Sequence, residues 1–277
     1  MLTYVVFTPR VQPRTANLIR VSTIAVLLLT CSLSAIAQQP PGNGKPEDSS
    51  WGFGAAVVST QKAYKGTDRE AKILPMLSYE NKYVKLSGPN VELKLPGIEF
   101  GDSQRLNFGV VAKLFGPGGY EASDSPALAG MAEREQSIWA GAKVEWKNDL
   151  ADVKLELLGD ASGNSKGQRV VLGVERKWKL SPSIMLVPQV GVEWVDDKYV
   201  DYYYGVRASE AIAGRPVYAG QSAVNAEVSV AGIYRFDKHH SMMLSVGVKA
   251  LGKEIKDSPI VDRSTENRVM LGYTYRF

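Results

Sequence analysis

Cysteine and histidine are nearly absent from this 277-residue sequence, which holds one cysteine and two histidines. Cys31 lies in the N-terminal segment, so a chain cleaved after Ala37 would form no disulfide and offer no thiolate to a metal. His239 and His240 are adjacent, and neighbouring residues of a strand or turn diverge, so we do not expect them to share a substrate or metal. Since barrel hydrolases usually need a histidine base, the sequence predicts a protein that is not an enzyme and has no cofactor.

Long apolar runs are also missing. No stretch of 18 apolar residues follows the N-terminal segment, so we expect no transmembrane helix there. Residues 1–37 combine three arginines and no acid with a short apolar run that ends on Ala35-Ile36-Ala37. This pattern predicts a cleaved signal peptide over 1–37 rather than a membrane anchor, with Ala35 and Ala37 as the cleavage signal.

The mature chain would carry little excess charge of either sign. Loss of the three arginines of 1–37 lowers the formal net charge from +4 to +1, so basic character gives no argument for a nucleic-acid partner. Residues 38–50 are rich in proline, glycine and serine, and we expect them to form a disordered periplasmic lead-in.

Alternation of apolar and polar residues is the pattern that fills residues 51–277. In the last segment, Leu271 and Tyr273 fall on one face, whereas Arg268 and Met270 fall on the other. Segments of about ten residues with one apolar face suit strands that cross a membrane at a tilt, and aromatic residues gather near their ends. The sequence therefore predicts an all-β fold, a transmembrane antiparallel up-and-down β-barrel in the outer membrane of a Gram-negative cell, with outer-membrane lipid around it.

The lengths of the connections predict twelve strands with the N-terminus in the periplasm, because all long connections then face outward. We expect strands at 51–59, 71–80, 82–88, 91–99, 104–115, 134–147, 150–160, 168–179, 183–196, 222–236, 239–251 and 265–277. Residues 82–99 are the weakest part of this count, because Pro89 and Pro96 cannot donate to a strand ladder.

Charged residues recur on the face that would line the barrel interior. These candidate lumen residues are Lys113, Lys143, Glu145, Lys154, Glu156, Glu175, Glu193, Glu227, Arg235, Lys249, Arg268 and Arg276. Such a set could line a narrow pore, or it could fill the interior with paired charges, and a barrel of twelve strands leaves modest room.

Tyrosine and arginine cluster in the longest predicted outer loop, at 197–221. The candidate recognition residues are Tyr199, Tyr202, Tyr203, Tyr204, Arg207, Arg215 and Tyr218. They could bind a carbohydrate, a protein or a small ligand, since tyrosine and arginine dominate recognition surfaces, or they could pack the loop onto the barrel rim. Nearby Asp196, Asp197 and Asp201 are more simply explained as a solvated acidic loop than as a site for a hard cation.

The C-terminal residues Tyr273, Tyr275 and Phe277 end an alternating apolar strand, which resembles the recognition signal for the barrel-assembly machinery of the outer membrane. Three further motifs resemble the MipA/OmpV family of outer-membrane proteins. They are Tyr64-Lys65-Gly66 with 74–79, the central run 201–206 with 210–211 and 214–218, and the terminal 272–277.

This resemblance implies a twelve-stranded barrel without catalytic residues. It also implies a partnership with a lytic murein transglycosylase and, through it, a peptidoglycan synthase, so we expect a scaffold in the cell envelope. Two alternatives stay open, a narrow channel for small molecules and a surface adhesin that acts through 197–221.

Overall fold

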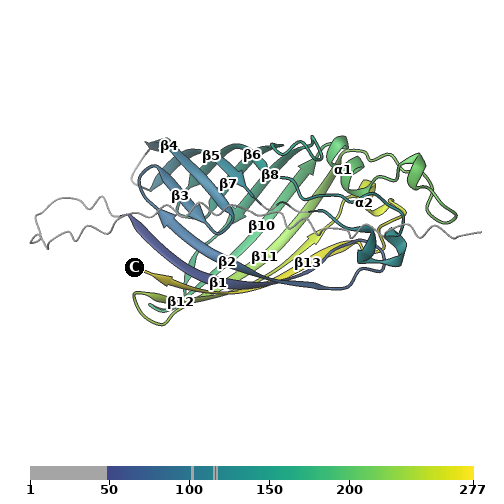
Figure 1. Cartoon of the computed structure of the whole chain (residues 1–277). Helices are drawn as coiled ribbons and strands as arrows, with labels where there is room; N and C mark the ends of the chain where they lie inside the picture. The colour runs from purple at the N-terminus through teal and green to yellow at the C-terminus, as the bar shows by residue number, and fades with distance from the viewer. Residues whose placement is uncertain (1–48, 101–102, 115, 117) are drawn as a thin grey trace, which may run out of the picture. The chain divides into compact units, whose positions relative to one another are not determined.

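The structure, a computed structural model, describes residues 49–277 except 101–102, 115 and 117. These residues form a β-barrel. The predicted signal peptide with its Ala35 and Ala37, and residues 38–48 of the predicted lead-in, lie outside the described residues. The barrel strands run diagonally around a common axis, with the two labelled helices at one end (Figure 1).

Every strand pairs antiparallel with its neighbours, and the last strand pairs with the first, so the sheet closes. The strands are β1 (Ser50–Gln61), β2 (Glu70–Glu80), β3 (Val84–Ser87), β4 (Asn90–Phe100), β5 (Gln104–Lys113), β6 (Trp139–Lys147), β7 (Asp152–Asp160), β8 (Gln168–Glu175), β9 (Trp178–Lys179), β10 (Ile184–Val195), β11 (Ala223–Arg235), β12 (His240–Ala250) and β13 (Thr265–Arg276). Because β8 and β9 both pair with β10, they share one position in the wall, and the barrel has the predicted twelve positions.

The two faces of each strand differ in the way that the alternation predicts. Along β12, Leu244, Val246 and Val248 are exposed on the outside, whereas Ser245 and Gly247 face inward and are half-buried. An outward apolar surface of this kind is stable only in hydrocarbon, and a closed sheet pairs the backbone groups that hydrocarbon would leave unsatisfied.

Connections at the two ends of the barrel differ in length. The short ones, such as 81–83 and 236–239, lie at the end that also carries Ser50 and Phe277, except the turn 88–89, which lies at the opposite end of β3. The long ones span 62–69, 114–138, 161–167, 196–222 and 251–264 and lie at the other end, beside α1 (Asp197–Tyr204) and α2 (Lys253–Lys256) (Figure 1). None of the helices among the described residues is long and apolar enough to cross a membrane.

Residues 82–99 form two strands, as the count required. Pro89 lies in the turn between β3 and β4, directly after Gly88, whose φ of +54° suits glycine. Pro96 lies in a β-bulge, where the register of β4 on β5 shifts between Leu95 and Ile98. Both prolines therefore occupy positions at which the ladder needs no N–H.

Three predicted boundaries were wrong. The segment 134–138, predicted as the start of a strand, belongs to a loop, and β6 begins only at Trp139 because Arg134 and Ser137 are buried in loop contacts. The strand predicted at 168–179 is interrupted at 176–177. The third correction concerns β3, which has four residues instead of seven.

Two epitope insertions test this topology. A tag after Gly163, where no atom lies within 4 Å of an added Cβ, is expected to bind antibody on intact cells. A tag after Lys238 is expected to bind only after the outer membrane is permeabilised, as measured by flow cytometry. Antibody binding to the second tag on intact cells would show the reverse orientation.

Candidate functional site

One mouth of the barrel, the predicted outer mouth, is covered by a packed cap, formed by the loops 62–69, 114–138, 161–167, 196–222 and 251–264. Most buried apolar residues of the described chain belong to it, among them Tyr64, Leu128, Tyr203, Ile255 and Ile260. The cap rests on a ring of apolar residues that face inward at the outer ends of the strands: Val111, Trp139, Leu158, Val195 and Ala223. A continuous apolar core thus joins the loops to the barrel.

Helix α1 brings the tyrosine cluster into this core. Its N-terminus is capped by Asp196, whose carboxylate accepts from the Tyr199 N–H at 3.0 Å. Tyr199, Val200, Tyr203 and Tyr204 lie on the buried side of the helix, and Tyr199 and Tyr203 pack with ring centroids 4.9 Å apart. Gly118 fits against Tyr203 only because it lacks a side chain, since a Cβ there would lie 2.6 Å from the ring.

A buried ion pair joins the two longest loops of the cap. Arg134 donates to both carboxylate oxygens of Glu210, at 3.0 and 2.9 Å, and to the Tyr202 carbonyl at 2.7 Å. Glu210 also accepts from the N–H groups of Ala132 and Arg207, each at 3.0 Å. The side chains of Arg134 and Glu210 are 1% and 4% exposed, so each charge depends on the other for its stability.

A second arginine makes the same connection through backbone atoms. Arg215 donates to the carbonyls of Ala127 at 2.7 Å, Ala129 at 3.1 Å and Glu210 at 2.7 Å. The Tyr203 hydroxyl lies 2.8 Å from the Ser137 hydroxyl and accepts from the Ser137 N–H. Loops 114–138 and 196–222 are therefore joined by several independent hydrogen bonds.

The predicted recognition residues are placed in two groups. Tyr199, Tyr203, Tyr204 and Arg215 are buried in the cap, where they hold loops together. Arg207 is exposed, and Tyr202 and Tyr218 are half-buried. A partner at the cell surface would meet the second group first.

Burial keeps the tyrosines of the cap protonated. It raises the pKa of Tyr120 to about 12, although the nearby Arg134 guanidinium acts in the opposite direction. Burial likewise raises the pKa of Tyr199 and Tyr204 well above 10. These phenols are therefore packing and hydrogen-bonding groups rather than acids or nucleophiles at neutral pH.

The predicted lumen charges are paired on one side of the barrel. Lys113 pairs with Glu156, and Lys143 with Glu92 at 2.5 Å. Lys147 lies 3.7 Å from Glu145. Glu175 lies 3.0 Å from Lys177.

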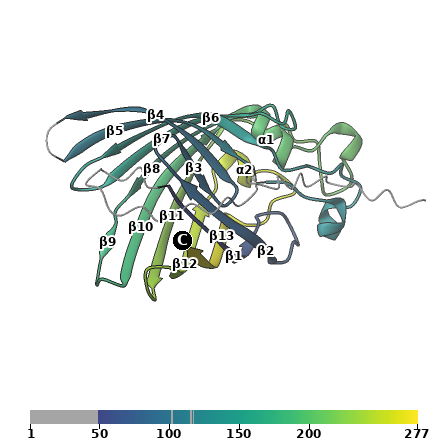
Figure 2. The same ribbon diagram turned by 60° about the vertical axis from the view of Figure 1, so that its left-hand side comes forward.

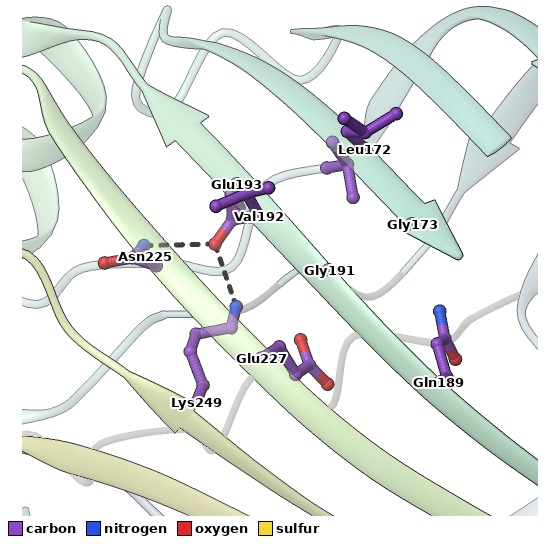
Figure 3. Close-up of a pocket in the computed structure, with 10 residues that line it drawn as sticks. Leu172, Gly173, Gln189, Gly191, Val192, Glu193, Asn225, Glu227 and Lys249 are labelled. Carbon is purple, nitrogen blue, oxygen red and sulfur yellow. Dashed lines mark hydrogen bonds and ion pairs between the residues drawn. The ribbon is translucent and has the colours of Figure 1, made fainter. Parts of the chain in front are cut away.

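Glu193 is the centre of the largest group. It accepts from Lys249 at 2.9 Å, from Asn225 at 3.1 Å and from the Arg169 Nε at 2.8 Å. Figure 3 shows Lys249 and Asn225 reaching Glu193 from two neighbouring strands. A cavity of about 40 Å³ beside them, also lined by Glu227, has room for water rather than for a solute.

Some charges in the lumen stand outside these groups. Among the described residues, Glu227, Arg235 and Arg268 make no salt bridge, and neither do Lys154 and Arg276. Glu92 and Arg169 are not among the predicted lumen residues. Both occupy inward positions of their strands, so the same alternation identifies them when it is extended.

The two histidines lie at the predicted periplasmic turn. Contrary to expectation they do not diverge fully, because both rings contact Tyr275, with centroids 5.7 Å away for His239 and 5.0 Å for His240. Phe277 stacks on Trp51 with centroids 4.0 Å apart, so the two ends of the barrel sequence meet in an aromatic group. Within the described part of the chain, no cluster of three histidine, cysteine or acidic residues could hold a metal.

A closed antiparallel sheet with an apolar outer face, an ion-paired lumen and one capped mouth defines an outer-membrane β-barrel protein. The chain belongs to the MipA family, because the family model described as "MltA-interacting protein MipA" matches residues 53–277. The protein accordingly resides in the outer membrane.

Several curated proteins are similar to most of the chain. It is 27% identical over 228 residues to "Putative outer membrane protein YiaT" of Escherichia coli K12, covering 81% of this chain and 90% of the relative. It is 24% identical to "MltA-interacting protein" of Escherichia coli K12, over 81% and 89% of the two chains. It is 24% identical to "Outer membrane protein OmpV" of Vibrio cholerae, over 91% of this chain and 98% of the relative.

Solved structures with some similarity are other outer-membrane barrels. The NanC porin gives a TM-score of 0.43 at 11% identity, over 82% of this chain and 98% of that chain. The COG4313 outer membrane channel from Pseudomonas putida F1 gives a TM-score of 0.43 at 12% identity, over 87% of this chain and 100% of that chain. Likeness at this level is too low to indicate function.

Replacement of Arg134 by alanine is expected to loosen the cap, because it leaves Glu210 buried without its partner, at a cost of about 3–5 kcal/mol. Trypsin should then cut within 197–221 under conditions in which the wild-type chain resists. Lys256→Ala is the matched control, since Lys256 is an exposed residue of the cap outside 197–221 and its loss removes no cleavage site from that loop. Equal resistance of the Arg134 variant and the wild type would contradict this role.

The cap is also expected to weaken in acid. Burial tends to raise the pKa of Glu210, but hydrogen bonds from Arg207, Ala132 and Arg134 outweigh it and lower the pKa below its usual value. A group with a lowered pKa stabilises the folded cap fully at neutral pH, and this contribution is lost as the pH falls below about 4.3. Trypsin is inactive there, so pepsin cleavage across pH 2–5 is the measurement, with Glu210→Gln expected to flatten the profile.

Proposed function

We propose that this protein is a non-enzymatic scaffold of the cell envelope that binds a lytic murein transglycosylase at the periplasmic end of the barrel. The observation that supports this proposal is membership of the family described as "MltA-interacting protein MipA", whose resemblance implies a lytic murein transglycosylase as a partner. A peptidoglycan synthase would then be a second partner, reached through the first.

The cap and the paired lumen favour a scaffold over an open channel. Solute passage would require the cap to move, and the buried Arg134–Glu210 pair opposes that movement. An adhesin would use the exposed part of the cap, where Arg207 and the half-buried Tyr202 and Tyr218 offer a small surface. Neither alternative has a specific observation in its favour.

The periplasmic rim offers one hollow for a protein partner. Strands β9 and β10 extend beyond the end of β7, as Figure 2 shows. The hollow beside them, of about 430 Å³, is lined mainly by polar residues of 148–152 and 176–179. Arg176 and Lys179 are exposed there, and Asp149 faces them from the next turn. This charged rim is the surface we assign to the partner.

Co-purification with a purified transglycosylase tests the proposal. The barrel in nanodiscs is expected to retain the enzyme several-fold better than an unrelated barrel does. The double change Arg176→Glu/Lys179→Glu should lower retention by about tenfold or more, since loss of charge complementarity at an interface costs a few kcal/mol. The control Lys198→Glu/Lys256→Glu alters exposed lysines of the outer end and should change nothing.

Retention no better than that of the unrelated barrel would overturn the scaffold proposal. Equal retention by the rim variant and the wild type would instead overturn the assignment of the rim.

A further inference from the structure

One row of the lumen wall is apolar across six strands, which neither a scaffold nor an ion-paired interior requires. Strand register joins six inward-facing residues in one continuous row across β2, β1, β13, β12, β11 and β10: Leu74, Ala56, Gly272, Met243, Ile233 and Met185. We call this row the apolar belt. Val58 and Met270 form part of the next row on the same face.

The orientation of the belt follows from the exposure of its neighbours. Met242 and Leu271 lie beside Met243 and Gly272 in their strands and are 39% and 46% exposed on the lipid side. Met243, Leu74 and Met270 are half-buried on the opposite face. Charged residues also face the lumen from the strands of the belt, among them Glu193, Lys249 and Arg268, but they lie in rows nearer the outer end. The belt is therefore an apolar row within a lumen that is charged elsewhere.

The barrel wall is interrupted next to this belt. β2 and β3 share three residue pairs, from Ser78–Ser87 to Glu80–Lys85, although β2 has eleven residues. The outer part of β2 includes Ile73, Leu74 and Pro75. Among the described residues it therefore pairs with β1 on one side and has no strand partner on the other. Unpaired strand edges are costly in hydrocarbon and invite pairing, and a proline at this edge removes one donor.

This interruption connects the belt with the membrane. Ile73 is 77% exposed toward the lipid, and the next residue, Leu74, faces the lumen. A flexible apolar chain could pass between the two environments without crossing a paired ladder. A second strand is a poor occupant, because Pro75 blunts the edge.

Two arginines lie where the belt meets the periplasmic end. Arg235 is two residues beyond Ile233 on the same face of β11, and Arg276 is four residues beyond Gly272 on β13. Both are exposed, and neither forms a salt bridge with a described residue. Their guanidinium groups suit a carboxylate, which arginine binds with two hydrogen bonds.

We propose that the lumen binds a long-chain fatty acid, with its acyl chain along the apolar belt and its carboxylate at Arg235 and Arg276. Strands about 4.8 Å apart put Leu74, at the far end of the belt, about 19 Å from Ile233, the belt residue nearest to Arg235, which suits an extended long acyl chain. A single row accommodates one chain, so a fatty acid fits better than a two-chain phospholipid. This binding is independent of the proposed scaffold function.

A photoreactive fatty acid tests the proposal. The full-length protein is placed in phosphatidylcholine nanodiscs that contain a palmitate analogue with a diazirine in its chain, and adducts are mapped by mass spectrometry after irradiation. Adducts are expected at Met243 and Met270 in the lumen as well as at Met242 on the lipid side. Excess palmitate should suppress the first two and leave the third unchanged, because Met242 reports only contact with bulk lipid.

Adducts confined to Met242 and other lipid-facing residues would overturn the proposal. The same outcome would follow if residues 38–48 of the chain itself occupied the belt. Unchanged labelling of Met243 under excess palmitate would also overturn it, since a specific site must saturate.

Two variants locate the site within the lumen. Met243→Lys should lower labelling of Met270 by about tenfold or more, because it introduces a charge into an apolar contact. Ser229→Lys, also inward-facing but outside the belt, is the matched control and should label like the wild type. Equal labelling in both variants would exclude the belt.

The arginines are tested by the double change Arg235→Gln/Arg276→Gln. This variant should weaken labelling by the carboxylate probe and leave labelling by its methyl ester unchanged. Equal loss with both probes, or no loss with either, would show that these arginines do not bind the carboxylate.

Discussion

The need to pair every backbone N–H and C=O group inside hydrocarbon is the constraint on which the rest of this structure depends. It demands a closed sheet, and closure between β1 and β13 provides one. It also explains where proline is found, since Pro89 lies in a turn and Pro96 in a bulge. Between neighbouring positions of the described wall, the ladder of β2 and β3 is the shortest, with three residue pairs, so the wall departs most from full pairing there.

Once the wall is closed, apolar packing has only the outer mouth in which to form a core. The five long loops supply it, and the Arg134–Glu210 pair and Arg215 fix their arrangement. A tyrosine-rich loop that would suit recognition thus serves first to cover the barrel. The proposed partner of the cell envelope would approach the other end, where the described chain has short turns instead of a cap.

The sequence predicted the strand face of the candidate lumen residues but not the contacts between them. Alternation assigned the lumen charges to the inner face, because strand geometry assigns a face to each residue from its position alone. It could not say which charges pair, since Glu193, Lys249 and Arg169 come from three strands far apart in the chain. It also missed the apolar belt, because the six residues of the belt become neighbours only through strand register.

The sequence by itself determined the class of protein, the count of twelve wall positions and the end of the barrel at which the long loops lie. These properties follow from a period of two and from loop lengths, which are local features. Only the tertiary structure decided that Tyr199, Tyr203 and Tyr204 are buried, that 134–138 is a loop, and that β3 is short. Each of these outcomes depends on contacts between segments distant in sequence, such as Arg134 with Glu210, whose energies no local pattern contains.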